Sequence, residues 1–144
     1  EINEKYPISI YEVVYNLECK LNENIGIIEY CKDNNIIFCA YQPLRRNRTA
    51  NRNYPLLVEL SEKYNKTQNQ IILNWLIKHK KLNVLIKTTN SSRINENINS
   101  LNFTIDMEDY NKLDLFKAEE FDKIVIDWEG KGGITVDQLA NQFE

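Results

Sequence analysis

The sequence predicts an α/β fold built on a parallel sheet of about three strands. Short apolar runs, rich in β-branched and aromatic residues, alternate with segments whose apolar residues recur every three or four positions. This alternation is typical of β–α–β units, which place their strands in a parallel sheet. Three parallel strands cannot close on themselves, so we expect a sheet with open edges unless another polypeptide completes it.

The first half of the chain supplies two of these strands. Ile10–Cys19 is rich in β-branched and aromatic residues and predicts a strand. Asn24–Lys32 has apolar residues at helical spacing and predicts a helix. Ile36–Tyr41 is an almost continuous apolar run, as a strand buried on both faces requires. Gln42–Asn53, rich in basic and amide residues, predicts a loop.

Two helices and a third strand follow. Pro55–Tyr64 predicts a helix with leucines directed inward. Thr67 and Gln70 match a capping box, which opens a helix with a broad apolar face. The basic run Lys78–Lys81 falls at the C-terminus of that helix, where cations complement the helix dipole. Val84–Ile86 is the third predicted strand.

The remainder of the chain predicts helices and an acidic tail. Ser91–Leu101 and Met107–Phe116 are expected to be helices, the second capped by Asp106. We therefore divide the chain into a body at 1–117 and an acidic, partly ordered tail at 118–144. Within that tail, Ile124–Ile126 is a candidate for a short strand, and Thr135–Phe143 is a candidate for a short helix.

Length and charge exclude several classes of protein. The chain has 144 residues, 42% of them hydrophobic, enough for one domain with a core but not for two. The formal net charge is -3, which argues against a general nucleic-acid or membrane-surface binder. No apolar run approaches the roughly 18 residues that cross a bilayer, and the chain does not open on a signal peptide.

Cysteine and histidine usage suggests the compartment and restricts the chemistry. The three cysteines are odd in number and show no CxxC spacing, so we expect free thiols in a reducing, cytoplasmic setting. His79 is the single histidine, which argues against a zinc site of His and Cys ligands. We expect His79 to be structural or merely exposed.

The most informative candidate site follows the third strand. Ligands of α/β folds bind at the carboxyl ends of strands, where Lys87 and Thr88 lead into a predicted helix with Arg93 in its first turn. Unpaired backbone N–H groups at a helix N-terminus favour an anion, and Lys and Arg suit a phosphate. An ordinary helix cap by Asn90 or Ser91 explains the same residues equally well.

Several ordered motifs resemble the aldo-keto reductase family over about residues 7 to 117. Asn34–Leu44 looks like the family's seventh strand with its "AYSPL" end, and Tyr64–Trp75 resembles the "YGKTPAQVALRW" helix. Ile86–Asn97 is similar to the "PKSxxxxRIxEN" signature, with its internal spacing intact. Phe103–Leu113 looks like the helix that follows. The resemblance implies that the chain is the C-terminal portion of a (β/α)8 TIM barrel.

The resemblance also implies NADP as cofactor and a small-molecule aldehyde or ketone as substrate. It marks nine positions as cofactor-binding: Asn16, Tyr41, Gln42, Leu44, Lys87, Thr88, Arg93, Glu96 and Asn97. Lys87, Thr88 and Arg93 would hold the 2′-phosphate of the adenosine ribose. Glu96 and Asn97 would contact the adenine.

At the nicotinamide end, Tyr41 would stack on the ring. Asn16 falls where the family usually has a Gln that binds the carboxamide. Asn16 is one methylene shorter than that Gln, Gln42 replaces the usual Ser, and Arg45 stands where a Gly is common. The pyrophosphate is therefore expected to meet a different loop, built from Arg45 to Arg52.

The family's catalytic Tyr, Lys, Asp and His belong to the first half of the barrel. No tyrosine of this chain matches that motif, so we expect no catalytic residue here. One hypothesis is the cofactor-binding part of an NADP-dependent reductase, completed by an N-terminal half-barrel. The alternatives are a non-catalytic nucleotide- or phosphate-binding half-barrel, and a structural half-barrel that self-associates through its open strand edges.

Overall fold

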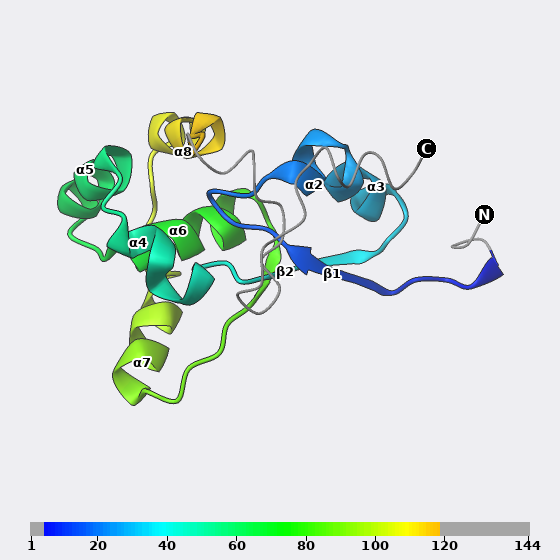
Figure 1. The fold of residues 1–144 in the computed structure, drawn as a ribbon, viewed down its shortest axis with the longest axis horizontal. Helices are drawn as coiled ribbons and strands as arrows, with labels where there is room; N and C mark the ends of the chain where they lie inside the picture. Colours follow the sequence, from blue (N-terminus) through cyan, green and yellow to red (C-terminus); the bar gives the residue numbers. More distant parts are fainter. Residues whose placement is uncertain (1–4, 119–144) are drawn as a thin grey trace, which may run out of the picture.

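The computed structural model describes residues 5–118 of the chain (Figure 1). Its sheet has three parallel strands in the order β1-β2-β3. The strands are β1 (Ile10–Val14), β2 (Ile37–Tyr41) and β3 (Asn83–Leu85). In register, Ile10 of β1 lies opposite Ile37 of β2, and Tyr41 lies opposite Leu85 of β3. The predicted α/β class, the parallel sheet and its open edges are confirmed.

Two short helices connect β1 and β2. They are α2 (Leu21–Asn24) and α3 (Ile27–Asp33), so the prediction of one helix over 24–32 was wrong. Gly26 separates them with φ 77°, a left-handed conformation that glycine adopts without steric cost. The chain changes direction there, and the apolar spacing that suggested one helix is divided between two segments.

The connection from β2 to β3 holds half of the helical residues that the structure describes. It contains a 3-10 turn η1 (Arg45–Asn47), α4 (Arg48–Asn51), α5 (Pro55–Tyr64), α6 (Gln68–Asn74) and a π-helical turn η2 (Trp75–His79). The region predicted as a loop therefore contains two short helical segments.

The predicted capping box is confirmed. Thr67 Oγ1 accepts from the Gln70 backbone N–H at 3.2 Å, and Gln70 Oε1 accepts from the Thr67 N–H at 3.1 Å. The box satisfies donors that the first turn of α6 leaves without a helical partner.

Two helices follow β3, α7 (Ser91–Asn99) and α8 (Met107–Leu115). Asp106 occupies the N-cap position of α8 as expected, but its side chain makes no cap hydrogen bond. Its carboxylate lies 3.2 Å from Lys63 Nζ instead. The strand and helix suggested at Ile124–Ile126 and Thr135–Phe143 lie outside the described residues.

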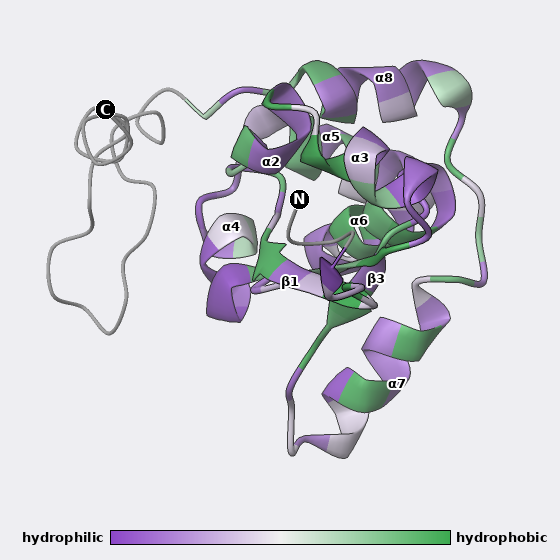
Figure 2. Cartoon of the chain, turned by 90° about the vertical axis from the view of Figure 1, so that its right-hand side faces the viewer, coloured by the Kyte–Doolittle hydropathy of each residue, from purple (hydrophilic) through white to green (hydrophobic). Residues whose placement is uncertain are grey.

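The core lies between one face of the sheet and the helices. Phe38 and Ala40 point into it, with exposed fractions of 5% and 0%, while Ile10, Ile37 and Leu85 on the other face are about half exposed. Figure 2 shows α3, α5, α6 and α8 above β1 and β3. The expectation that β2 is buried on both faces was therefore wrong for this chain.

His79 is structural, as expected. Its Nε2 lies 2.7 Å from Asp114 Oδ2, and its ring stacks on Tyr110 with centroids 4.5 Å apart. Trp75 Nε1 donates to the other Asp114 oxygen at 2.7 Å. The π-helical turn therefore joins α6 to α8. Within residues 5–118, no helix combines the length and apolar character needed to cross a membrane.

Candidate functional site

A cavity of about 380 Å³ opens where β2 and β3 end. Its walls come from the segment after β2, the segment after β3 and the first turns of α7. Seven of the nine predicted site residues line it: Gln42, Leu44, Lys87, Thr88, Arg93, Glu96 and Asn97. Residues separated by up to 55 positions in the sequence are thus brought to one cavity, at the end of the sheet where ligands of α/β folds bind.

The cavity wall is strongly basic. Lys87 and Arg93 line one part of it, and Arg45 and Arg46 line another, against a single carboxylate, Glu96. Within the described part of the chain, neither Lys87 nor Arg93 forms an ion pair. Lys87 and Arg93 therefore contribute a positive potential at the cavity that attracts an anion.

The first turn of α7 is capped by its own neighbour. Asn90 Oδ1 accepts from the backbone N–H groups of Ser92 at 2.9 Å and Arg93 at 3.2 Å. The alternative interpretation, an ordinary helix cap by Asn90, is therefore correct for these two backbone N–H groups. An anion here would be bound by the side chains of Lys87, Thr88 and Arg93 rather than by the two capped N–H groups.

Glu96 connects α7 to α6. Its Oε1 accepts from Thr67 Oγ1 at 2.6 Å, and its backbone oxygen accepts from Gln70 Nε2 at 3.0 Å. The capping box of α6 therefore also fixes the part of α7 that faces the cavity.

Two predicted site residues do not line the cavity. Tyr41 ends β2, in register with Leu85, on the open face of the sheet. Its side chain is half-buried, and burial raises the pKa of its phenol above the ordinary value. The ring therefore lies where the strand ends, beside the cavity rather than within its wall.

Asn16 is fully buried and organises the turn after β1 instead. Its Oδ1 accepts from the backbone N–H groups of Glu18 and Cys19, each at 3.0 Å, and its Nδ2 lies 3.4 Å from the Gln42 carbonyl. The side chain replaces the backbone partners that a tight turn lacks. Its carboxamide is thus held between the turn and the backbone of Gln42, so this geometry does not support a contact with a ligand.

Sequence reasoning missed Glu18. Its side chain has an exposed fraction of 0%, and its carboxylate accepts from Arg45 Nη1, while Arg52 Nε lies 3.9 Å away. The available signals were an acid near the end of the predicted strand Ile10–Cys19 and four arginines in the predicted loop Gln42–Asn53.

The segment after β2 has an unusual backbone. Arg45, Arg46 and Asn47 have φ values of 48°, 54° and 69°, a left-handed run without glycine. Such conformations cost of order 1 kcal/mol each and persist only where surrounding contacts enforce them.

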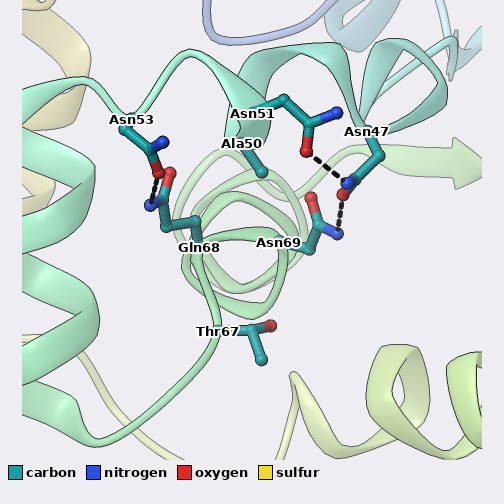
Figure 3. A pocket seen from close by; sticks show the side chains of 7 residues that line it. All are labelled: Asn47, Ala50, Asn51, Asn53, Thr67, Gln68 and Asn69. Atoms are coloured by element: carbon teal, nitrogen blue, oxygen red, sulfur yellow. Dashed lines mark hydrogen bonds between the residues drawn. The ribbon is translucent and has the colours of Figure 1, made fainter.

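Amide side chains supply part of that enforcement. Asn69 Nδ2 donates to Asn47 Oδ1 at 2.5 Å, Asn47 Nδ2 to Asn51 Oδ1 at 2.8 Å, and Gln68 Nε2 to Asn53 Oδ1 at 3.0 Å (Figure 3). These bonds border a second cavity of about 380 Å³, and they hold the segment after β2 against the start of α6.

Comparison with known proteins gives a consistent result. Residues 1–118 match the sequence model of the "Aldo/keto reductase family". The chain is 34% identical over 116 residues to aldo-keto reductase family 1 member A1 of Sus scrofa, covering 74% of this chain and 35% of that protein. It is 35% identical over 100 residues to the NADPH-dependent alpha-keto amide reductase of Saccharomyces cerevisiae, covering 64% of this chain and 31% of that protein.

Solved structures show the same similarity. The thermostable aldo-keto reductase Tm1743, crystallised with the inhibitor epalrestat, superposes with a TM-score of 0.64 at 31% identity, over 75% of this chain and 39% of that one. The described residues thus have the fold of part of a (β/α)8 barrel, its C-terminal portion. The chain spans about a third of the length of the curated relatives it matches.

Proposed function

The chain belongs to the aldo/keto reductase family, and on that premise we propose that it forms the NADP(H)-binding part of an enzyme that reduces aldehydes and ketones. The cavity at the ends of β2 and β3 carries this proposal, because it presents two groups of cations, Lys87 with Arg93 and Arg45 with Arg46. NADP(H) has two separate phosphate-bearing regions, the 2′-phosphate and the pyrophosphate. The charges and their division into two groups suit such a ligand.

Lys87, Thr88 and Arg93 are proposed to bind the 2′-phosphate. A phosphate dianion suits a Lys point charge beside an Arg fork, whereas a ribose hydroxyl does not require two cations. Glu96 and Asn97 line the same part of the cavity and are proposed to contact the adenine. The adenosine end of the cofactor would thus lie against α7.

The pyrophosphate is proposed to lie against the segment after β2. Gln42, Leu44, Arg45 and Arg46 line the cavity there. The guanidinium of Arg45 stands where the family commonly has a Gly, and Arg46 adds a second one. Electrostatic attraction would therefore contribute more to pyrophosphate binding in this chain than in relatives without these arginines.

Tyr41 is proposed to support the nicotinamide ring from the open face of the sheet. When bound, the reduced cofactor supplies a hydride to the carbonyl carbon of a small-molecule substrate. The proton donor for that reaction is assigned to an N-terminal half-barrel that covers this face. We do not carry forward the expected role of Asn16 at the carboxamide, because its side chain is buried in the turn after β1.

Titration with NADPH and NADH, followed by fluorescence, tests the proposal. NADPH should bind at least about tenfold more tightly, because charge-assisted hydrogen bonds contribute about 1.5–3 kcal/mol each. Lys87→Met and Arg93→Met should each remove most of this preference and leave NADH binding nearly unchanged. Lys32→Met, which removes an exposed cation of α3, is the matched control and should retain the preference.

Two results would contradict the proposal. Equal affinity for NADPH and NADH would refute the assignment of Lys87 and Arg93. Absence of binding to either cofactor would favour a structural half-barrel. A third result, tight NADPH binding with no carbonyl reduction after addition of a first-half barrel, would favour the non-catalytic binding module.

A further inference from the structure

We propose that Glu18 is a positioning residue that holds the Arg45 guanidinium at the cavity wall to receive a phosphate group. The inference rests on the phosphate-binding role proposed above for this cavity. Glu18 itself does not line the cavity and would act through Arg45, which does.

The turn after β1 positions the carboxylate of Glu18. Asn16 Oδ1 accepts from the Glu18 backbone N–H at 3.0 Å and so fixes the backbone of the turn. The Glu18 side chain is completely buried and pairs with Arg45 Nη1, while the Arg45 side chain retains an exposed fraction of 16%. The pair therefore runs from the protein interior to the cavity, with its anion inside and its cation at the wall.

Stability alone does not explain this ion pair. Removing a carboxylate from water is costly, and replacing a buried ion pair by apolar side chains is often neutral or stabilising. Glu18 Oε1 adds to that cost, because it is buried and accepts no hydrogen bond among the described residues, and the Arg52 Nε that pairs with it lies 3.9 Å away. The pair does fix the place and direction of one guanidinium, which apolar packing would not do.

The backbone around Arg45 points to the same role. Arg45 is the first of three successive residues with positive φ, followed by Arg46 and Asn47. Contacts fix this strained run at both ends, through Glu18 at Arg45 and through Asn69 at Asn47. Strain of this kind is typical of ligand clamps, where it holds groups ready for a ligand.

The experiment measures binding of inorganic pyrophosphate to the 144-residue chain by isothermal titration calorimetry. Glu18→Gln keeps the size of the side chain but removes the charge that holds Arg45, and should weaken pyrophosphate binding about tenfold. Adenosine 2′-monophosphate, which would bind at Lys87 and Arg93, should bind equally to both proteins. Glu29→Gln, the same charge change at an exposed site of α3, is the control and should bind pyrophosphate as the parent does.

A double-mutant cycle separates positioning from a general effect on the fold. Arg45→Ala alone should weaken pyrophosphate binding about tenfold, and adding Glu18→Gln should weaken it no further. If Glu18→Gln does not fold, Glu18→Asp carries the same test, because one methylene less draws Arg45 away from the cavity. It too should weaken pyrophosphate binding and leave adenosine 2′-monophosphate binding unchanged.

The outcomes distinguish this inference from the proposed function. Unchanged pyrophosphate binding in Glu18→Gln, an equal loss for both ligands, additive losses in the cycle, or no pyrophosphate binding by the parent chain would each overturn it. Pyrophosphate binding with the predicted pattern, together with no binding of NADPH, would support the role of Glu18 and refute the proposed cofactor.

Discussion

At the scale of single residues, the buried polar side chains divide into those that serve the site and those that serve the fold. Asn16 belongs to the second group, since its carboxamide oxygen accepts two backbone N–H groups of the turn after β1. Glu18 serves both the fold and the site. It is buried in the turn after β1, and its carboxylate holds Arg45, which lines the cavity.

Asn16→Ala is predicted to lower the free energy of unfolding by about 1–3 kcal/mol, because it leaves the N–H groups of Glu18 and Cys19 buried without acceptors. Binding of adenosine 2′-monophosphate should not change. Urea denaturation and calorimetry measure the two effects. Asn95→Ala, at an exposed position of α7, is the control and should shift stability by no more than about 0.5 kcal/mol. Unaltered stability of Asn16→Ala would contradict the structural role.

Asp109 joins α8 to α5 and should make stability depend on pH. Its side chain has an exposed fraction of 1% and accepts from Lys63 Nζ at 2.6 Å, Tyr64 Oη at 2.7 Å and Lys112 Nζ at 2.9 Å. Burial raises the pKa of this carboxyl, but the three donors outweigh burial and lower the pKa to about 2. The ionised form is therefore favoured in the folded state relative to the unfolded one.

A depressed carboxyl pKa contributes stability above the unfolded pKa near 4, and that contribution is lost as the pH falls toward 2. Asp109→Asn is predicted to cost about 2 kcal/mol at pH 7, where it weakens a buried charged network. The difference from the parent protein should shrink between pH 4 and pH 2, as followed by urea denaturation. Asp33→Asn, at an exposed carboxyl, should show no such convergence, and a pH-independent Asp109→Asn difference would contradict the argument.

At the scale of elements, the start of α6 connects fold and site. Thr67 caps α6 and also donates to Glu96, which lines the cavity from α7. Thr67→Ala is predicted to lower the free energy of unfolding by about 1–2 kcal/mol, because it removes an N-cap and a second hydrogen bond. Thr67→Ser keeps the hydroxyl and should cost less than about 0.5 kcal/mol in the same denaturation experiment. Equal losses for Ala and Ser would assign the effect to the methyl group instead.

Local sequence patterns predicted those helices and strands whose determining residues lie close together in the sequence. The capping box at Thr67 and the proline start of α5 each follow from a few neighbouring residues, and the parallel sheet follows from the regular alternation of strands and helices. The interruption at Gly26 was missed, because the helical spacing of apolar residues continues across it while the helical conformation of the backbone does not. The left-handed run at Arg45–Asn47 was missed for a related reason, since Arg has no preference for positive φ and only tertiary contacts hold it there.

The candidate site was predictable to a similar degree. The resemblance to the family's motifs identified the residues that meet at the cavity, from Gln42 to Asn97, because those motif positions correspond to strand ends and helix starts. The sequence left open whether Asn90 or Ser91 caps α7, and it could not show that Asn16 faces into its own turn or that Glu18 is buried beneath Arg45. Those facts depend on which way side chains point, and the sequence does not specify this for isolated polar residues.

At the scale of the whole molecule, the unusual feature is a parallel sheet with one uncovered face. Ile10, Ile37 and Leu85 on that face have exposed fractions of 57%, 48% and 55%. Parallel sheets are normally covered on both faces, and exposed apolar patches of this kind mark surfaces that bind another protein. In the proposed enzyme, this face would look into the barrel and be covered by the N-terminal half-barrel.

This arrangement predicts that the isolated 144-residue chain self-associates through the sheet. Sedimentation velocity should detect dimers or larger species at micromolar concentration. The double variant Ile37→Lys with Leu85→Lys should shift the population toward monomer, because it places charges on the face that must be desolvated. The variant should keep the fold, since both side chains lie away from the core.

Ile98→Lys provides the matched control, because Ile98 is 60% exposed but lies on α7 rather than on the sheet. It should leave the sedimentation profile unchanged. A first-half barrel from a related reductase should compete for the same face, so its addition should dissolve the self-associated species of the parent chain but fail to bind the double variant. If the parent chain is monomeric, or if Ile98→Lys disperses it as well as the double variant does, the open face is not the contact surface.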